Sequence, residues 1–356
     1  PPTEPPTEPA SKASSAVSDH PPPAPPPAPA QPAVNPARAL VKALKQGDTA
    51  TVSSLIDGDA ALLERRGMWE NTPLLVACHY LHSELALMLL ARGADAAASN
   101  EAGATALLFA CVDSIEGVAT RLLEMVDAGG SSILLDPPPA MVYSRSTDST
   151  DPRTPLQAAA ENGFLAGVSG LLARGAARDP LALMLSASRG HTSCCEALLQ
   201  AVLPPDGSAP ADGAAAPSKW LAEALTLSAQ RGHEGVIKAL AAHPLTRQAV
   251  PECGGAAVRA ACALRGGDAP SSGEGSGLRE RIVACLCDAG APTDFVPEGS
   301  NDGSTALHIA AGKGLATTVS LLLAAGADAA KLNAAGDSAA ELARRAGHEQ
   351  LATTIG

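Results

Sequence analysis

Two His-Glu pairs begin like a zinc-protease motif, in which two histidines one helical turn apart bind zinc and a glutamate acts as general base. The pairs occupy residues 233–234 and 348–349, but Ile237 and Ala352 stand where the second histidine is required. Neither segment supplies the ligand set, so the sequence predicts no metal site there.

Two other segments have the composition of phosphate-binding loops. Residues 273–277 read Gly-Glu-Gly-Ser-Gly, but no strand is expected before them and the spacing differs from that of a dinucleotide loop. Residues 312–314 read Gly-Lys-Gly without the upstream glycine and the following serine or threonine of a nucleotide loop. We interpret the first segment as a linker, with phosphate binding as the alternative, and expect no cofactor.

The chain contains eight cysteines without zinc-ribbon or CxxC spacing, which indicates reduced, intracellular thiols. Adjacent cysteines such as Cys194 and Cys195 rarely bridge, and Cys285 and Cys287 point apart on a helix. Core or partly exposed thiols are expected, and a thiol enzyme using Cys194 or Cys285 is the alternative. Because no catalytic constellation is complete, the sequence predicts that the protein is not an enzyme.

The composition favours stacked helices over one thick core. Aromatic residues make up only 2% of the 356 residues, whereas alanine, leucine and glycine are abundant. The net charge of -12 and the lack of a basic run argue against nucleic-acid binding. No run of about 18 apolar residues is available for membrane insertion. We expect an intracellular protein, and the cytoplasm is the first expectation. The chain does not begin with Met, so a nuclear or organellar location after removal of a targeting peptide is the alternative.

Residues 1–34 form a proline-rich segment that includes PPPAPPPAPAQP. Proline fixes φ and lacks an N–H, so this segment is predicted to be a disordered tail that samples polyproline II. A solvated spacer is the expected role, and docking to a proline-recognising module is the alternative.

From Asn35 onward, a unit of about 33 residues recurs. In its clearest copy, residues 302–328, Thr305 can cap a first helix and Gly314 can end it in a left-handed conformation. Leucines 321–323 then supply the buried face of a second helix. Each unit is therefore predicted to be a pair of helices.

This unit resembles the ankyrin repeat, whose pattern is DxxGxTPLHxAAxxGHxxVVxLLLxxGAD. Further strong matches are centred on the threonines Thr72, Thr105 and Thr154. Weaker copies lack the threonine, and there Asp179 and Ser218 offer earlier helix caps.

The resemblance implies an all-α fold, an ankyrin-repeat solenoid of about nine helix-turn-helix units with short β-hairpin loops. The repeat domain is expected to span residues 35–356, with atypical capping units at 36–66 and 338–355. Segments rich in Gly, Ser, Pro and Asp near 129–150, 201–217 and 266–278 are expected to be loop insertions.

The resemblance also implies that a protein partner binds a concave groove formed by the hairpin tips and the exposed ends of the first helices. The repeat register places there the residues that precede each helix-ending position. The predicted partner-binding residues of this kind are His79, Tyr80, Asp113, Glu161, Asn162, Arg189, Arg231 and Lys313. The last three would form a basic stripe, and solvated helix ends are the alternative.

The two tryptophans, Trp69 and Trp220, both lie three residues before the threonine position of their repeat, where a hairpin tip is expected. An exposed tryptophan on a rim is typical of a binding hot spot. Packing against a neighbouring insertion explains both residues equally well.

The histidine of the TPLH motif is present only as His308 in these units. It normally ties one repeat to the next through hydrogen bonds, so the middle units are expected to be less rigid. His79 and His82 lie three residues apart and could share a metal, but His82 falls on the Gly-His position of the repeat and is expected to be structural.

The predicted function is that of a non-catalytic scaffold or adaptor that binds a protein through the groove. The alternative is a regulatory or targeting module of an enzyme, either as a subunit or within a longer chain. Membership of a larger complex stays open.

Overall fold

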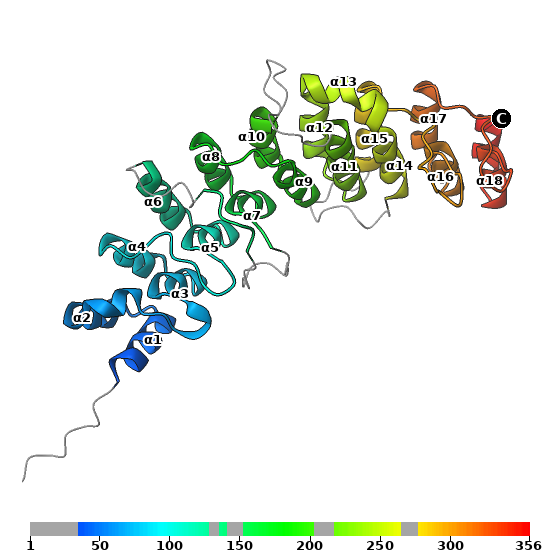
Figure 1. The fold of residues 1–356 in the computed structure, drawn as a ribbon. Helices are drawn as coiled ribbons and strands as arrows, with labels where there is room; N and C mark the ends of the chain where they lie inside the picture. Colours follow the sequence, from blue (N-terminus) through cyan, green and yellow to red (C-terminus); the bar gives the residue numbers. More distant parts are fainter. Residues whose placement is uncertain (1–34, 128–134, 141–151, 203–216, 265–276) are drawn as a thin grey trace, which may run out of the picture.

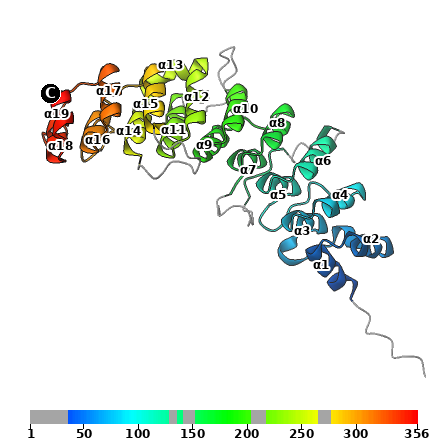
Figure 2. The ribbon, with the colours of Figure 1, turned by 180° about the vertical axis from the view of Figure 1, so that it is seen from behind.

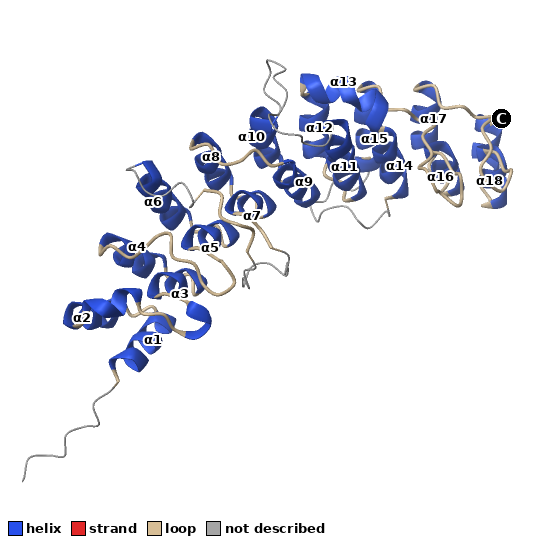
Figure 3. Cartoon of the chain, in the orientation of Figure 1, coloured by secondary structure: helices blue, strands red, loops and turns tan. Residues whose placement is uncertain are grey.

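The computed structural model describes residues 35–127, 135–140, 152–202, 217–264 and 277–356. The proline-rich segment 1–34 and most of the three expected insertions lie outside these ranges. The described residues form nineteen α-helices and two 3₁₀ helices. They contain no strand, as Figure 3 shows.

Eighteen of these α-helices form nine consecutive pairs, which confirms the predicted solenoid within the described ranges. The first helices of the pairs are α1 (Pro36–Gln46), α3 (Pro73–His79), α5 (Ala106–Val112), α7 (Pro155–Glu161), α9 (Pro180–Arg189), α11 (Pro217–Gln230), α14 (Gly255–Ala263), α16 (Ala306–Gly312) and α18 (Ala339–Arg345). The second helices are α2 (Thr49–Gly58), α4 (Ser83–Ala91), α6 (Glu116–Asp127), α8 (Leu165–Ala173), α10 (Thr192–Val202), α12 (Glu234–Ala242), α15 (Leu278–Asp288), α17 (Ala316–Ala324) and α19 (Glu349–Ile355).

The pairs stack into one curved array (Figures 1 and 2). The first helices follow one another along the inside of the bend and the second helices along the outside. Each first helix packs against the next first helix, so no repeat has a core of its own. The apolar core is continuous along the array, with small residues such as Ala77 and Ala110 completely buried between the first helices.

Local chemistry sets where the first helices begin. The hydroxyl groups of Thr72, Thr105 and Thr154 each accept a hydrogen bond from the third backbone N–H of the following helix. Pro73 and Pro155 occupy the first helical position, where no N–H partner is needed. The earlier cap predicted at Asp179 is confirmed, because its carboxylate accepts from the Leu181 N–H at 2.8 Å.

Glycine and histidine join successive repeats through a recurring contact that we call the Gly–His clasp. The glycine after a first helix has positive φ, and the imidazole that precedes the second helix of the next repeat lies directly against it. The clasps pair Gly47 with His82, Gly163 with His191, Gly190 with His233, and Gly314 with His348. In the first three, Nε2 contacts the carbonyl oxygen two residues before the glycine, at 3.0–3.1 Å. His82 therefore has the structural role predicted for it.

A second tie between repeats uses the TPLH position. His308 Nδ1 accepts hydrogen bonds from Thr305, and its Nε2 donates to the Asp337 carbonyl at 3.2 Å. Gln157 makes the equivalent connection, since its side-chain amide bonds to both Thr154 and Asp179. Arg259 reaches the Ser304 carbonyl of the next repeat. In these two repeats another side chain makes the connection that histidine makes at His308, while the lower rigidity expected for the middle units stays a prediction.

Two elements depart from the simple repeat. An additional helix, α13 (Pro244–Cys253), lies between α12 and α14 and packs against α11 and α12. The expected β-hairpins are reduced to isolated bridges in the described residues, such as Ser99 with Thr105 and Leu332 with Ser338. The loops still reverse direction at left-handed glycines, but their ladders are too short to count as strands.

Candidate partner-binding site

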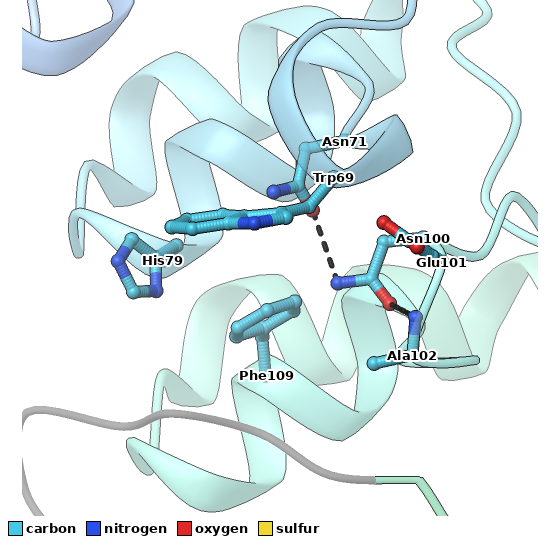
Figure 4. A pocket seen from close by; sticks show the side chains of 7 residues that line it. All are labelled: Trp69, Asn71, His79, Asn100, Glu101, Ala102 and Phe109. Atoms are coloured by element: carbon cyan, nitrogen blue, oxygen red, sulfur yellow. Dashed lines mark hydrogen bonds between the residues drawn. The ribbon is translucent and has the colours of Figure 1, made fainter.

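A pocket of about 700 Å³ opens between the second and third repeats. It lies where the loop before α3, the end of α3 and the loop before α5 meet (Figure 4). Its lining residues are Trp69, Asn71, His79, Asn100, Glu101, Ala102 and Phe109. Two residues predicted from the sequence, Trp69 and His79, are thus brought together.

Trp69 is 67% exposed although it is one of the largest apolar side chains. It lies in the short 3₁₀ helix η2 (Met68–Glu70), and both Trp69 and Glu70 have positive φ, at 56° and 59°. Two consecutive non-glycine residues in this region are strained and persist only where surrounding contacts hold them. Of the two alternatives that the sequence left open, exposure on the rim therefore applies to Trp69, and its role in binding stays a prediction.

Hydrogen bonds from both repeats hold the strained loop in place. The Glu101 N–H donates to the Trp69 carbonyl at 3.0 Å. Arg66 Nη1 donates to the carbonyl oxygens of Ser99, at 2.8 Å, and Glu70, at 3.2 Å. The indole is therefore presented to solvent by a braced loop, so little conformational entropy is lost when a partner contacts it.

Aromatic rings form one part of the pocket wall. Figure 4 shows the indole of Trp69 above the ring of Phe109, with His79 to one side. The imidazole of His79 meets the Phe109 ring edge-on, with centroids 5.9 Å apart, and also contacts Tyr80 at 5.0 Å. Phe109 is only 4% exposed and forms the floor.

Polar groups form the opposite part of the wall. Asn100 Nδ2 donates to Asn71 Oδ1 at 3.1 Å, and Asn100 Oδ1 accepts from the N–H groups of Ala102 and Ala104. These bonds fix the turn that precedes α5. The carboxylate of Glu101 stands on this turn and is exposed.

Sequence reasoning missed Asn71, Asn100, Glu101, Ala102 and Phe109 as pocket residues. The available signal was the register: Trp69 precedes Thr72 by three residues, and residues 100–102 precede Thr105 by three to five. Neighbouring repeats place these two loops side by side, so the pocket takes lining residues from both loops.

Glu161 departs from the sequence prediction. It was expected at an exposed helix end, but it is 7% exposed and forms ion pairs with Arg153 and Arg189, each at 2.9 Å. Burial alone would raise the pKa of this carboxyl, but the hydrogen bonds and positive charge of the two arginines outweigh burial and hold the pKa below its ordinary value. Glu161 is therefore a connecting residue rather than a contact surface, because its oxygens are already satisfied.

The three cations of the predicted basic stripe all reach back to the preceding repeat. Arg189 bonds Glu161, Arg231 Nη1 donates to the Ser188 carbonyl at 2.6 Å, and Lys313 Nζ donates to carbonyl oxygens at the end of α14, including that of Cys262 at 3.3 Å. Cations at helix C-termini are favoured by the helix dipole. Their heads stay accessible, as in Arg189 with a 51% exposed side chain, so a contact with a partner remains a prediction.

Trp220 is not on the rim. Its helix α11 begins at Pro217, earlier than the family pattern, so Trp220 lies in the first turn of that helix and is only 5% exposed. The expected exposed tryptophan is therefore wrong at this position, and Trp220 belongs to the core. The remaining predicted residues, Tyr80, Asp113 and Asn162, are half-buried at the ends of α3, α5 and α7.

The cysteines offer no activated thiol among the residues that the structure describes. Burial raises the pKa of Cys194 to about 11 and that of Cys195 to about 12. Burial likewise raises the pKa of Cys285. The alternative of a thiol enzyme using Cys194 or Cys285 is therefore disfavoured, since its nucleophile would be protonated at neutral pH.

Short helix pairs stacked side by side, with loops that converge on the inside of the bend, define a helical-repeat scaffold. Residues 302–337 match the family model described as "Ankyrin repeat". Taken with the nine helix pairs, this match makes the chain an ankyrin-repeat protein.

No curated protein matches the chain. Among solved structures, the human ASB11 ankyrin repeat domain is similar at 17% sequence identity and a TM-score of 0.35, with 89% of this chain and 97% of that chain covered. In the part of the chain that the structure describes, none of the helices has the length and apolar character needed to cross a membrane.

Proposed function

We propose that this protein is a non-catalytic scaffold or adaptor that binds a protein partner on the inside of its bend, with the pocket at Trp69 as the anchor. Ankyrin repeats are generally protein–protein interaction modules, which supports the class of function. The pocket supports the place, because an exposed indole beside a concave aromatic surface is the usual composition of an interface hot spot.

The observation that carries the proposal is the braced exposure of Trp69. Its side chain is 67% exposed, and its strained backbone is held by Arg66 and by the Glu101 N–H. A merely structural tryptophan gains stability by burial. Strain retained to hold one in solvent is instead typical of a site that acts on something outside the chain.

The proposed surface continues from the pocket along the ends of the first helices, past Tyr80, Asp113 and Asn162 to Arg189, Arg231 and Lys313. These side chains change from aromatic and acidic to basic along the array. Such a gradient would orient an elongated partner, because opposite charges at its two ends would fit only one direction. Glu161 and Trp220 are not part of this surface.

The test is affinity capture of partners by the full chain from native lysate, with quantitative mass spectrometry of what is retained. Trp69→Ala should reduce one or more specifically retained proteins at least about tenfold, as expected for a hot-spot aromatic. Leu332→Ala is the matched control, because Leu332 is also 57% exposed in the loop before α18. Retention of the same proteins in equal amounts by Trp69→Ala and wild type would refute the proposed site.

An intracellular setting is part of the proposal. All eight cysteines are free, and burial raises the pKa of those in the core, such as Cys78 and Cys111, to about 12. Thiols of this kind serve as small apolar core residues, and the composition is typical of a reducing compartment.

A further inference from the structure

We propose that the pocket between the second and third repeats receives an arginine side chain of the partner, stacked on the indole of Trp69 and paired with Glu101. This inference rests on the proposed function and names the chemistry that the site selects. It follows from three properties of the pocket: one exposed indole face, amides that are already bonded, and one uncommitted carboxylate.

The exposed indole of Trp69, above the buried ring of Phe109, supplies one side of a slot suited to a flat cation. Figure 4 shows the indole of Trp69 and the ring of Phe109 on two sides of the hollow, with His79 closing one end. Aromatic faces carry negative electrostatic potential and attract cations placed over them, with tryptophan the most effective. A guanidinium is planar and stacks on such faces, whereas an ammonium is compact and strongly hydrated, so the slot favours arginine over lysine.

The amides in the wall are committed within the protein. Asn71 Nδ2 donates to the Met68 carbonyl, and its Oδ1 accepts from Asn100. Asn100 Oδ1 already accepts two backbone N–H groups. These amides shape the wall, so polar recognition of a ligand falls to another group.

Glu101 is that group. Its side chain is exposed at the pocket, and its carboxylate has no hydrogen bond or ion pair among the described residues. None of the lining residues is a lysine or arginine. The nearby Arg66 is engaged by the carbonyl oxygens of Ser99 and Glu70 and by the Glu70 carboxylate at 3.9 Å.

Charge decides between a cationic and a neutral occupant. A neutral aromatic or aliphatic side chain filling the slot would remove water from Glu101 without giving it a partner, which is unfavourable. A guanidinium can donate to both carboxylate oxygens while its plane stays on the indole. The net charge of -12 would also favour the approach of a basic segment.

The test uses small probes on the 356-residue chain labelled with ¹⁵N. N-acetyl-arginine amide is titrated while the two tryptophan indole N–H signals are followed, with the Trp69 signal assigned by its absence in Trp69→Phe. The citrulline amide serves as the neutral, isosteric probe, and the lysine amide as the compact cation. We expect a saturable shift of the Trp69 signal only, with arginine binding about fivefold more tightly than citrulline and more tightly than lysine.

Glu101→Gln should reduce arginine binding to the level of citrulline. Glu298→Gln, at an exposed carboxylate in the loop before α16, should leave both affinities unchanged. The position of the buried Trp220 signal reports whether each variant remains folded.

Equal affinity for arginine and citrulline, an arginine affinity unaffected by Glu101→Gln, or no saturable shift with arginine would each overturn the inference. These failures are distinct from failure of the proposed function. If arginine does not bind but Trp69→Ala still loses a captured protein, the interaction site stands and its arginine chemistry is wrong. If arginine binds but Trp69→Ala retains every captured protein, the pocket binds arginine and the proposed scaffold surface is wrong.

Discussion

Replacing Glu161 with glutamine tests whether this buried carboxylate holds the fourth and fifth repeats together. Glu161 is 7% exposed, and it lies between Arg153, with a 16% exposed side chain, and Arg189, at 51%. Removing one partner of a buried ion pair costs about 3–5 kcal/mol. The ion pair with Arg189 is half exposed, so its contribution is taken as less than about 1 kcal/mol. Glutamine has the same shape as glutamate and keeps one hydrogen-bond acceptor, which lowers the expected loss further. We therefore expect Glu161→Gln to lower the free energy of unfolding by about 2–3 kcal/mol.

The assay is urea unfolding followed by circular dichroism at pH 7, with Glu124→Gln as the matched control. Glu124 pairs with Arg121 on the surface, where the two side chains are 54% and 49% exposed, so its loss should cost less than about 0.5 kcal/mol. Because repeat arrays can unfold in stages, the comparison uses the first transition that changes in the variant.

The effect of Glu161→Gln should depend on pH in a defined direction. The folded-state pKa of Glu161 lies below its ordinary value of 4.5, so the ionised form stabilises the native state. This contribution is fully present above about pH 4.5 and disappears as the pH falls through the lower folded-state value. The difference between wild type and variant should therefore shrink in acid. A loss at pH 7 no larger than that of Glu124→Gln, or a difference that grows in acid, would refute the assigned role.

Three further predictions concern the joins between repeats. His308→Ala should cost about 1–2 kcal/mol in urea unfolding, whereas His308→Gln should retain most of the stability because Gln157 makes the same connection; equal losses would contradict this. Gly190→Ala should be more destabilising than Gly93→Ala by about 1 kcal/mol or more. Both glycines have positive φ, but only Gly190 faces an imidazole, and the added methyl carbon would lie 2.6 Å from His233 Nδ1. Identical urea midpoints for the two variants would show that the clasp does not contribute to stability. Burial lowers the pKa of His233, so as the pH falls the unfolded state takes up a proton on this histidine before the folded state does. Stability should therefore fall as the pH drops below the ordinary pKa of 6.5, and it should fall less steeply in His233→Gln. Parallel pH profiles of wild type and variant would exclude His233 as the source of this pH dependence.

The repeat register was readable from the sequence because each unit carries its own start and stop signals. Thr72 and Thr154 cap their helices, and Gly314 ends α16 with positive φ, as local chemistry requires. These rules act within a few residues, so they do not depend on the rest of the fold. The number of helix pairs followed from the same signals.

The parts that sequence did not reveal depend on neighbouring repeats. Trp220 was misplaced because α11 begins before the family pattern, and the extra helix α13 carries no repeat signature. Glu161 was expected in solvent because Arg153, which covers it, lies in a loop whose path only the folded array defines. The pocket at Trp69 likewise needs two loops about 30 residues apart, which only stacking brings together.

The Gly–His clasp has a consequence for how this array can lengthen or shorten over evolutionary time. Because the glycine belongs to one repeat and the histidine to the next, the contact is kept only where two adjacent repeats supply both residues. Loss of the fifth repeat would bring His233 onto Gly163, and a clasp would form again. Loss of the second would bring Ile115 onto Gly47 and leave that glycine without its imidazole. Of these two deletions, only that of the fifth repeat would keep every remaining glycine of the clasps against an imidazole.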